Sequence, residues 1–200
     1  YSFLDGASLP EELVGRAADL GYGALAITDH DGLYGAMEFA QLAHAADIRP
    51  ITGAEITLTD GSHLTLIAIN RTGYANLCRL ITAAHQPVQS EVVSGIPEPR
   101  KRRSAQQRPA LDPALLSAHA EGLVLLTGCR QGRLARLVDA GRYREAEQLV
   151  REYVTWFGPD NVIVELQHNL VYGDTARVRR LAALARRARL PVVATNDVHY

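Results

Sequence analysis

The stretch Ala24-Leu25-Ala26-Ile27-Thr28-Asp29-His30-Asp31-Gly32 joins a short apolar run to a cluster of polar residues. Short apolar runs bounded by turn signals are typical of buried strands. The segment before it, residues 8–20, has apolar residues at helical spacing, with Ser8 and Glu11 as a predicted capping box and Gly21 as a stop signal. A helix followed by a buried strand is the repeating unit of an α/β fold.

The same alternation continues along the chain. The patterns predict strands over residues 24–28, 49–52, 55–59, 63–69, 123–127, 161–166 and 191–195, mostly separated by helices. This order favours an α/β domain with a largely parallel sheet, either a barrel or a doubly wound sheet. Apolar residues make up 47% of the chain, so one domain with a sizeable core is expected.

Composition excludes several classes of protein. No apolar run reaches the length of a membrane span, and the two cysteines do not make a disulfide scaffold, which favours a reducing, cytoplasmic location. The net charge of −1 gives no sign of general affinity for nucleic acids. The chain starts at Tyr1 without a signal-peptide pattern, so we expect a fragment of a longer protein.

Residues 86–109 break the alternation. They contain several prolines, serines and glutamines and the basic run from Arg100 to Arg103. This composition cannot bury a core, so we predict a flexible basic insertion. A DNA-binding role for the basic run is an alternative, but such runs are more often solvated loops.

Side chains that commonly bind metals recur beside the predicted strands. They fall mostly just past the carboxyl ends of the strands, where α/β proteins build their active sites; they are His30, Glu55, Cys129, Asp197 and His199. Imidazole, carboxylate and thiolate together suit zinc, with manganese or iron as alternatives. Each residue alone has a plainer reading: Asp29 and Asp31 would cap turns, and Cys129 would be a small buried side chain. Their recurrence at one edge of the sheet favours a metal site.

The motifs also resemble a known family. In the same order, the chain resembles the PHP (polymerase and histidinol phosphatase) domains of bacterial C-family DNA polymerases at residues 1–7, 27–36, 53–55, 63–66, 70–77, 126–129 and 194–200. The resemblance covers nearly the whole chain outside residues 86–109. Residues 127–130 and 165–168 are more similar to the error-prone branch than to the main replicative subunit.

This resemblance implies a distorted (β/α)7 barrel with up to three metal ions, zinc or else manganese or iron, at the carboxyl edge of its strands. It implies that Glu55, His63 and Cys129 share one ion, and that Asp5, His30 and His199 share another. Asp197 would join Glu55 at a further ion, together with a His-x-His pair expected upstream of Tyr1, on a first strand that this chain lacks. We therefore expect the 200-residue chain to retain at most two of the three ions and little or no nuclease activity.

The resemblance also implies a function. The parent protein would be an error-prone DNA polymerase acting in damage-tolerant replication, with DNA, its other polymerase domains and a sliding clamp or other repair proteins as partners. The domain itself would be a metal-dependent phosphoesterase, in some members a 3′–5′ exonuclease, with the catalytic positions Asp5, His30, Glu55, Asp197 and His199. Metals suit this chemistry because they activate water and clamp a phosphate. Two alternatives remain: a metal-free module that stabilises the polymerase, and a stand-alone phosphatase of the same superfamily.

Overall fold

A computed structural model describes residues 8–86 and 108–196. In this part of the chain six strands form one sheet in the order β1-β2-β3-β4-β5-β6. The strands are β1 (Ala24–His30), β2 (Arg49–Thr57), β3 (His63–Ala68), β4 (Leu123–Leu126), β5 (Val162–Gln167) and β6 (Val192–Thr195). The helices are α1 (Pro10–Asp19), α2 (Ala36–Ala45), α3 (Arg71–Ala84), α4 (Ala114–Ala118), α5 (Arg133–Asp139), α6 (Tyr143–Phe157) and α7 (Asp174–Ala188), with the short 3-10 helix Pro159–Asn161 before β5.

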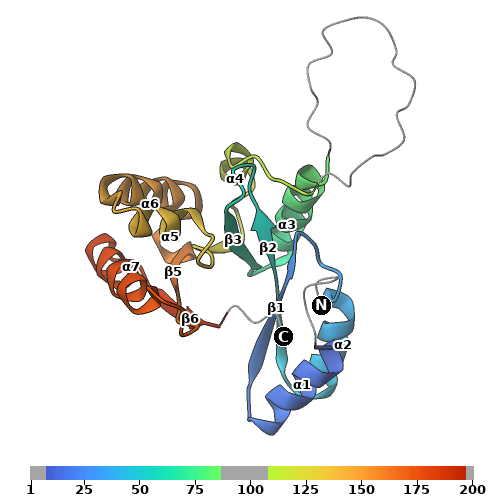
Figure 1. Cartoon of the computed structure of the whole chain (residues 1–200). Coiled ribbons are helices and arrows are strands. Elements are labelled where there is room, and N and C mark those ends of the chain that lie inside the picture. The colour runs from blue at the N-terminus through green and yellow to red at the C-terminus, as the bar shows by residue number, and fades with distance from the viewer. Residues whose placement is uncertain (1–7, 87–107, 197–200) are drawn as a thin grey trace, which may run out of the picture.

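The strand order decides between the two architectures expected from the sequence. Each strand pairs with its neighbour along the chain, whereas a doubly wound sheet reverses its order at a switch point. The sheet also curls, with α1 and α2 beside β1, α3 and α4 beside β2 and β3, and α5, α6 and α7 beside β5 and β6 (Figure 1). The fold is a partial barrel, as the family resemblance predicts.

The central hairpin of β2 and β3 corrects one expectation. Residues 49–52 and 55–59 were expected to form separate strands, but β2 runs unbroken from Arg49 to Thr57. Gly53 permits this, because a Cβ there would lie 2.5 Å from the carbonyl oxygen of Leu66 on β3. The sheet is largely parallel as expected, and the exception is β3, which is antiparallel to both β2 and β4.

The hairpin has a consequence for the edge of the sheet. β1, β4, β5 and β6 follow the parallel sense, so their carboxyl ends share one edge. β3 runs the other way, so the start of β3, where His63 lies, meets that same edge. The hairpin therefore places His63, at the start of β3, at the same edge as the carboxyl ends of the parallel strands.

Two apolar clusters hold the fold. The larger one runs from β2 to α7 and includes the fully buried Leu66, Leu77, Leu123 and Leu134. The smaller one packs α1 and α2 on β1 around Phe39, which is 0% exposed. Both clusters pack helices against the sheet.

Some expectations lie outside the described residues. These are the predicted ligands Asp5, Asp197 and His199 and residues 87–107 of the predicted insertion. Among residues 8–86 and 108–196, no helix combines the length and the apolar character that crossing a membrane requires.

Candidate metal centre

The predicted ligands His30, Glu55 and His63 meet at the carboxyl edge of the sheet. One ligand atom from each lies within 4.8 Å of the others. The pairing of the strands explains this, because His30 at the end of β1 is the direct partner of Glu55 on β2. Thr57 is the partner of His63, and because side chains alternate along a strand, Glu55 and His63 point to the same face.

Cys129 completes a four-residue group, which we call the ligand cluster (His30, Glu55, His63 and Cys129). Its Sγ lies 3.7 Å from Glu55 Oε1 and 3.9 Å from His63 Nδ1. The two imidazole rings meet edge to face with centroids 5.0 Å apart. All four side chains are at least partly buried, so the cluster is not a scatter of exposed surface groups.

The spacing within the ligand cluster suits a metal ion. Nitrogen, oxygen and sulfur ligands at zinc distances around a tetrahedral ion lie roughly 3.3–3.7 Å apart. The Cys129–Glu55 distance and the His30–Glu55 distance are both 3.7 Å. His63 Nδ1 and Glu55 Oε1 are closer, at 2.7 Å, and form a hydrogen bond. An ion that replaced the proton of this bond would need only a small separation of the two side chains.

The electrostatics of the cluster follow from that hydrogen bond. The bond to Glu55 raises the pKa of His63 above its ordinary value, against the opposing effect of burial. Metal ligands must be deprotonated, so an ion binding here would displace the His63 proton. The donor set of two imidazoles, a carboxylate and a thiol fits zinc best, and the described residues therefore fit the implied metal.

Asp29 and Asp31 have structural roles, as expected for turn caps. Asp29 is 2% exposed and accepts a hydrogen bond from the backbone N–H of Gly35 at 2.8 Å, which anchors the start of α2. The Asp31 carboxylate accepts hydrogen bonds from the N–H and the hydroxyl of Thr57 at the end of β2. Both carboxylates fix the loop that follows His30.

Glu165 supports the cluster in a way that its position in the sequence did not reveal. It is 5% exposed at the carboxyl end of β5, and its Oε2 accepts a hydrogen bond from the N–H of Gly128, directly before Cys129. Its Oε1 accepts hydrogen bonds from Gln167 and Thr195. Gly128 itself has φ +89°, and a Cβ there would lie 2.3 Å from the carbonyl oxygen of His63. Glu165 and Gly128 therefore position the loop that carries Cys129.

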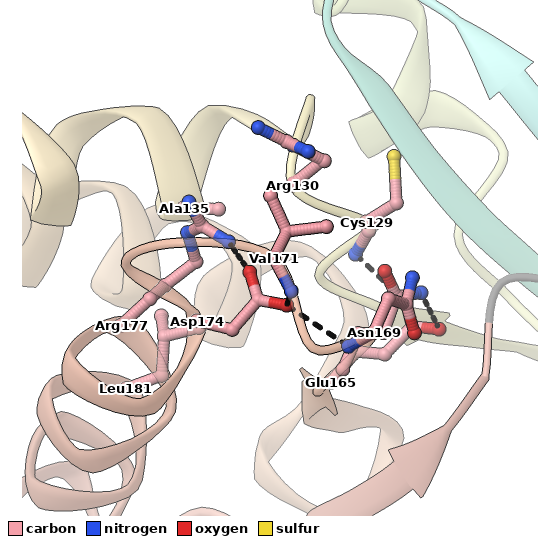
Figure 2. A pocket seen from close by; sticks show the side chains of 11 residues that line it. Cys129, Arg130, Ala135, Glu165, Asn169, Val171, Asp174, Arg177 and Leu181 are labelled. Atoms are coloured by element: carbon pink, nitrogen blue, oxygen red, sulfur yellow. Dashed lines mark hydrogen bonds and ion pairs between the residues drawn. The ribbon is translucent and has the colours of Figure 1, made fainter.

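A second polar group lies next to the ligand cluster, and we call it the Arg177 network (Asp139, Asp174 and Arg177). Arg177, 9% exposed, donates to Asp139 at 2.7 Å and to Asp174 at 2.8 Å. Burial raises the pKa of Asp174, but hydrogen bonds from the backbone of Val171 and Asn169 and from Arg177 outweigh it, and the pKa is lowered overall. Figure 2 shows the Asp174 carboxylate between Arg177 and this backbone.

Comparison with known proteins agrees with the fold. The family model described as the PHP domain matches residues 1–169. The chain belongs to the PHP family. It is 42% identical over its whole length to an error-prone DNA polymerase of Symbiobacterium thermophilum and 37% identical to a DNA polymerase III subunit alpha of Treponema pallidum. It spans 18% and 17% of the length of those two PHP relatives.

Solved PHP-like structures share the fold. A candidate metal-dependent phosphoesterase from Bifidobacterium adolescentis aligns with 98% of this chain and 84% of its own, with a TM-score of 0.60 and 18% identity. An amidohydrolase from Chromobacterium violaceum, solved with bound sulfate and without metal, aligns with a TM-score of 0.59 and 19% identity over 98% of this chain and 84% of its own. At this identity the likeness concerns the fold alone.

Proposed function

We propose that this PHP domain is part of an error-prone DNA polymerase and is itself a metal-dependent phosphodiesterase that hydrolyses DNA at a 3′ end. The observation that carries the proposal is the ligand cluster, where four side chains from four separate segments meet at the edge of the sheet. A purely structural module would not need two imidazoles, a carboxylate and a thiol at mutual distances that suit an ion. The identity to DNA polymerases over the whole of this chain supports the choice of DNA as the substrate.

The described residues have distinct roles in this proposal. Glu55, His63 and Cys129 would hold one ion, and His30 would hold another with Asp5 and His199. Asp197 would join Glu55 at a further ion. When bound, the ions supply an activated water and neutralise charge on the phosphodiester. Binding of the ion would displace the proton of the hydrogen bond between Glu55 and His63, and Gly128 and Glu165 would keep Cys129 in reach. The intact polymerase would bring DNA, its other domains and a sliding clamp to the site in the cytoplasm. Residues 86–109 would form a flexible basic insertion beside the domain.

Metal content is the first test of the proposal. The purified chain, titrated with zinc or manganese after removal of metals, is expected to bind at least one ion per molecule in a calorimeter. Chelator-treated chain without any measurable binding would contradict the proposal and favour the structural module.

Hydrolysis is the second test, and it belongs in the full-length protein. We expect release of nucleotides from the 3′ end of labelled single-stranded DNA when the metal is present, and loss of that release on chelation. The His63→Ala variant in the same protein separates this site from the polymerase site, because only the PHP activity should fall. Equal release by both proteins would overturn the assignment.

A further inference from the structure

The loop between β5 and α7, residues 168–173, exposes more apolar surface than a surface loop normally does. Leu170 is 89% exposed, Val171 41% and Tyr172 101%. Clustered apolar side chains on a surface usually mark a site of interaction. The loop follows the carboxyl end of β5, which is the edge that carries the ligand cluster.

The backbone of the loop is held in place. The Asp174 carboxylate accepts hydrogen bonds from the N–H groups of Asn169 and Val171, at 2.9 Å and 3.1 Å. His168 also contacts the Thr175 hydroxyl at 2.9 Å. Leu170 is held at φ +60°, in the left-handed region that a leucine rarely adopts. Fixing the backbone that carries an exposed aromatic side chain lowers the entropy that the loop loses on binding.

The loop borders the ligand cluster through a small pocket. Cys129, Arg130, Gln167, Asn169 and Val171 line it together (Figure 2). Within residues 8–86 and 108–196, the exposed Arg130 guanidinium has no hydrogen bond or ion pair, and the buried Gln167 Oε1 has no hydrogen-bond partner. A positive charge and an acceptor thus lie between the loop and the ligand cluster.

Single-stranded nucleic acids bind where exposed aromatic rings and positive charges belong to one surface, since bases stack on the rings and phosphates pair with the cations. We propose that Tyr172, supported by Leu170, is a stacking platform for a base of a single DNA strand, and that Arg130 binds a phosphate between that base and the ligand cluster. The proposal rests on the proposed function for its choice of DNA over a protein partner. Tyr172 and Arg130 are binding residues here, because neither belongs to the ligand cluster.

Binding without metal tests the platform separately from hydrolysis. Affinity of the 200-residue chain for a short fluorescein-labelled oligothymidylate is measured by anisotropy in the presence of chelator. Tyr172→Ala is expected to raise Kd by about tenfold, as for loss of one stacked base, while Tyr172→Phe keeps the wild-type Kd. Tyr22→Ala is the matched control, because Tyr22 is 53% exposed just before β1, at the opposite edge of the sheet.

Salt dependence tests the second residue. Arg130→Gln is expected to lower the slope of log Kd against log salt concentration by about 0.7, the value for one phosphate contact on a single strand. Circular dichroism confirms that each variant is folded. An unchanged slope would remove Arg130 from the proposal.

The outcomes distinguish the platform from the proposed function. The platform is overturned if Tyr172→Ala and the wild type have the same Kd, or if the wild type does not bind the oligonucleotide. If the chain still binds metal in that case, the phosphodiesterase proposal stands. If DNA binding depends on Tyr172 but no ion binds, the platform stands and the phosphodiesterase proposal fails. If Tyr172→Ala impairs association with the other polymerase domains and leaves Kd unchanged, the loop is a protein interface and the proposal is wrong.

Discussion

The ligand cluster and the Arg177 network are both polar groups at one edge of the same sheet, and they differ in what they hold together. In the Arg177 network a guanidinium is paired with two carboxylates, so its charges compensate one another within the chain. The ligand cluster instead brings together two imidazoles, a carboxylate and a thiol, which are the side chains that bind metals. Removing one partner of a buried ion pair destabilises a fold, whereas several metal-binding groups placed together indicate a ligand. The predictions below test this difference.

The largest effect is expected on metal binding in the ligand cluster. His63→Ala removes one of the ligands, and the loss is about 3–4 kcal/mol, since a full ligand set contributes on the order of 10–16 kcal/mol. Calorimetric titration should therefore show an affinity for zinc about a hundredfold to a thousandfold weaker. His44→Ala is the control, because His44 is exposed on α2 and should leave zinc binding unchanged. Equal affinity of the His63 variant and the wild type would remove His63 from the site.

The Arg177 network should behave in the opposite way. Arg177→Ala leaves two carboxylates without their cation, and breaking such a pair costs about 3–5 kcal/mol when it is buried. We expect the lower end, about 3 kcal/mol, because the Asp139 side chain is 38% exposed. Urea unfolding should show this loss while zinc binding stays within a few-fold of wild type.

An exposed ion pair between α7 and α6 is the matched control. Arg187 pairs with Glu147 at 3.1 Å, with both side chains largely exposed. Arg187→Ala should change the free energy of unfolding by less than about 1 kcal/mol. A loss of zinc binding in the Arg177→Ala variant would show instead that the ligand cluster and the Arg177 network form one site.

Gly128 connects stability with the ligand cluster. Gly128→Ala introduces a Cβ at 2.3 Å from the His63 carbonyl in a left-handed conformation, so the backbone before Cys129 must shift. We expect a loss of about 2 kcal/mol in the free energy of unfolding, and a weaker zinc affinity as Cys129 moves. Gly141→Ala is the control, since its φ is also positive at +71° but no atom lies within 4 Å of its Cβ. If both variants bind zinc equally well, the close approach at Gly128 does not position Cys129.

The sequence predicted much of this arrangement because its strongest signals are local. Apolar runs, helix stops and turn residues predicted most strands close to their observed bounds, as for residues 123–127, where β4 spans Leu123–Leu126. The family resemblance then named Glu55, His63 and Cys129 together, and the structure brings them together. Local patterns did not predict the unbroken β2, because whether a strand passes through Gly53 depends on the fit against β3.

The contacts that support the ligand cluster could not be predicted from local sequence patterns for a similar reason. Glu165 and Gly128 are far apart in the chain, and no pattern of neighbours shows that a carboxylate on β5 accepts a hydrogen bond from the loop after β4. The Arg177 network likewise joins α5 to α7. Such contacts depend on the pairing and curl of the whole sheet, which the sequence patterns constrain only as a class of fold. The expected roles of Asp5, Asp197 and His199 remain predictions.

The smallest effect concerns Asp60, in the turn before His63. Its carboxylate accepts hydrogen bonds from the N–H and hydroxyl of Ser62 and from Arg133 on α5, so it ties the hairpin of the ligand cluster to the helix. Burial raises the pKa of Asp60, but these hydrogen bonds and the charge of Arg133 outweigh burial, and the pKa lies below its ordinary value. The carboxylate form is therefore favoured in the folded chain.

The pH dependence follows from that direction. A carboxyl whose pKa is lower when folded contributes stability above its unfolded pKa, about 3.9 for aspartate, and loses it as pH falls through the folded pKa. Asp60→Asn should thus lower the free energy of unfolding near neutral pH by less than about 1 kcal/mol, because both Asp60 and Arg133 are more than one-third exposed. The difference from wild type should shrink below about pH 4 and should also shrink in high salt. A difference that persists unchanged in acid would mean that the Asp60 charge contributes nothing and that the shape of the turn alone holds the hairpin.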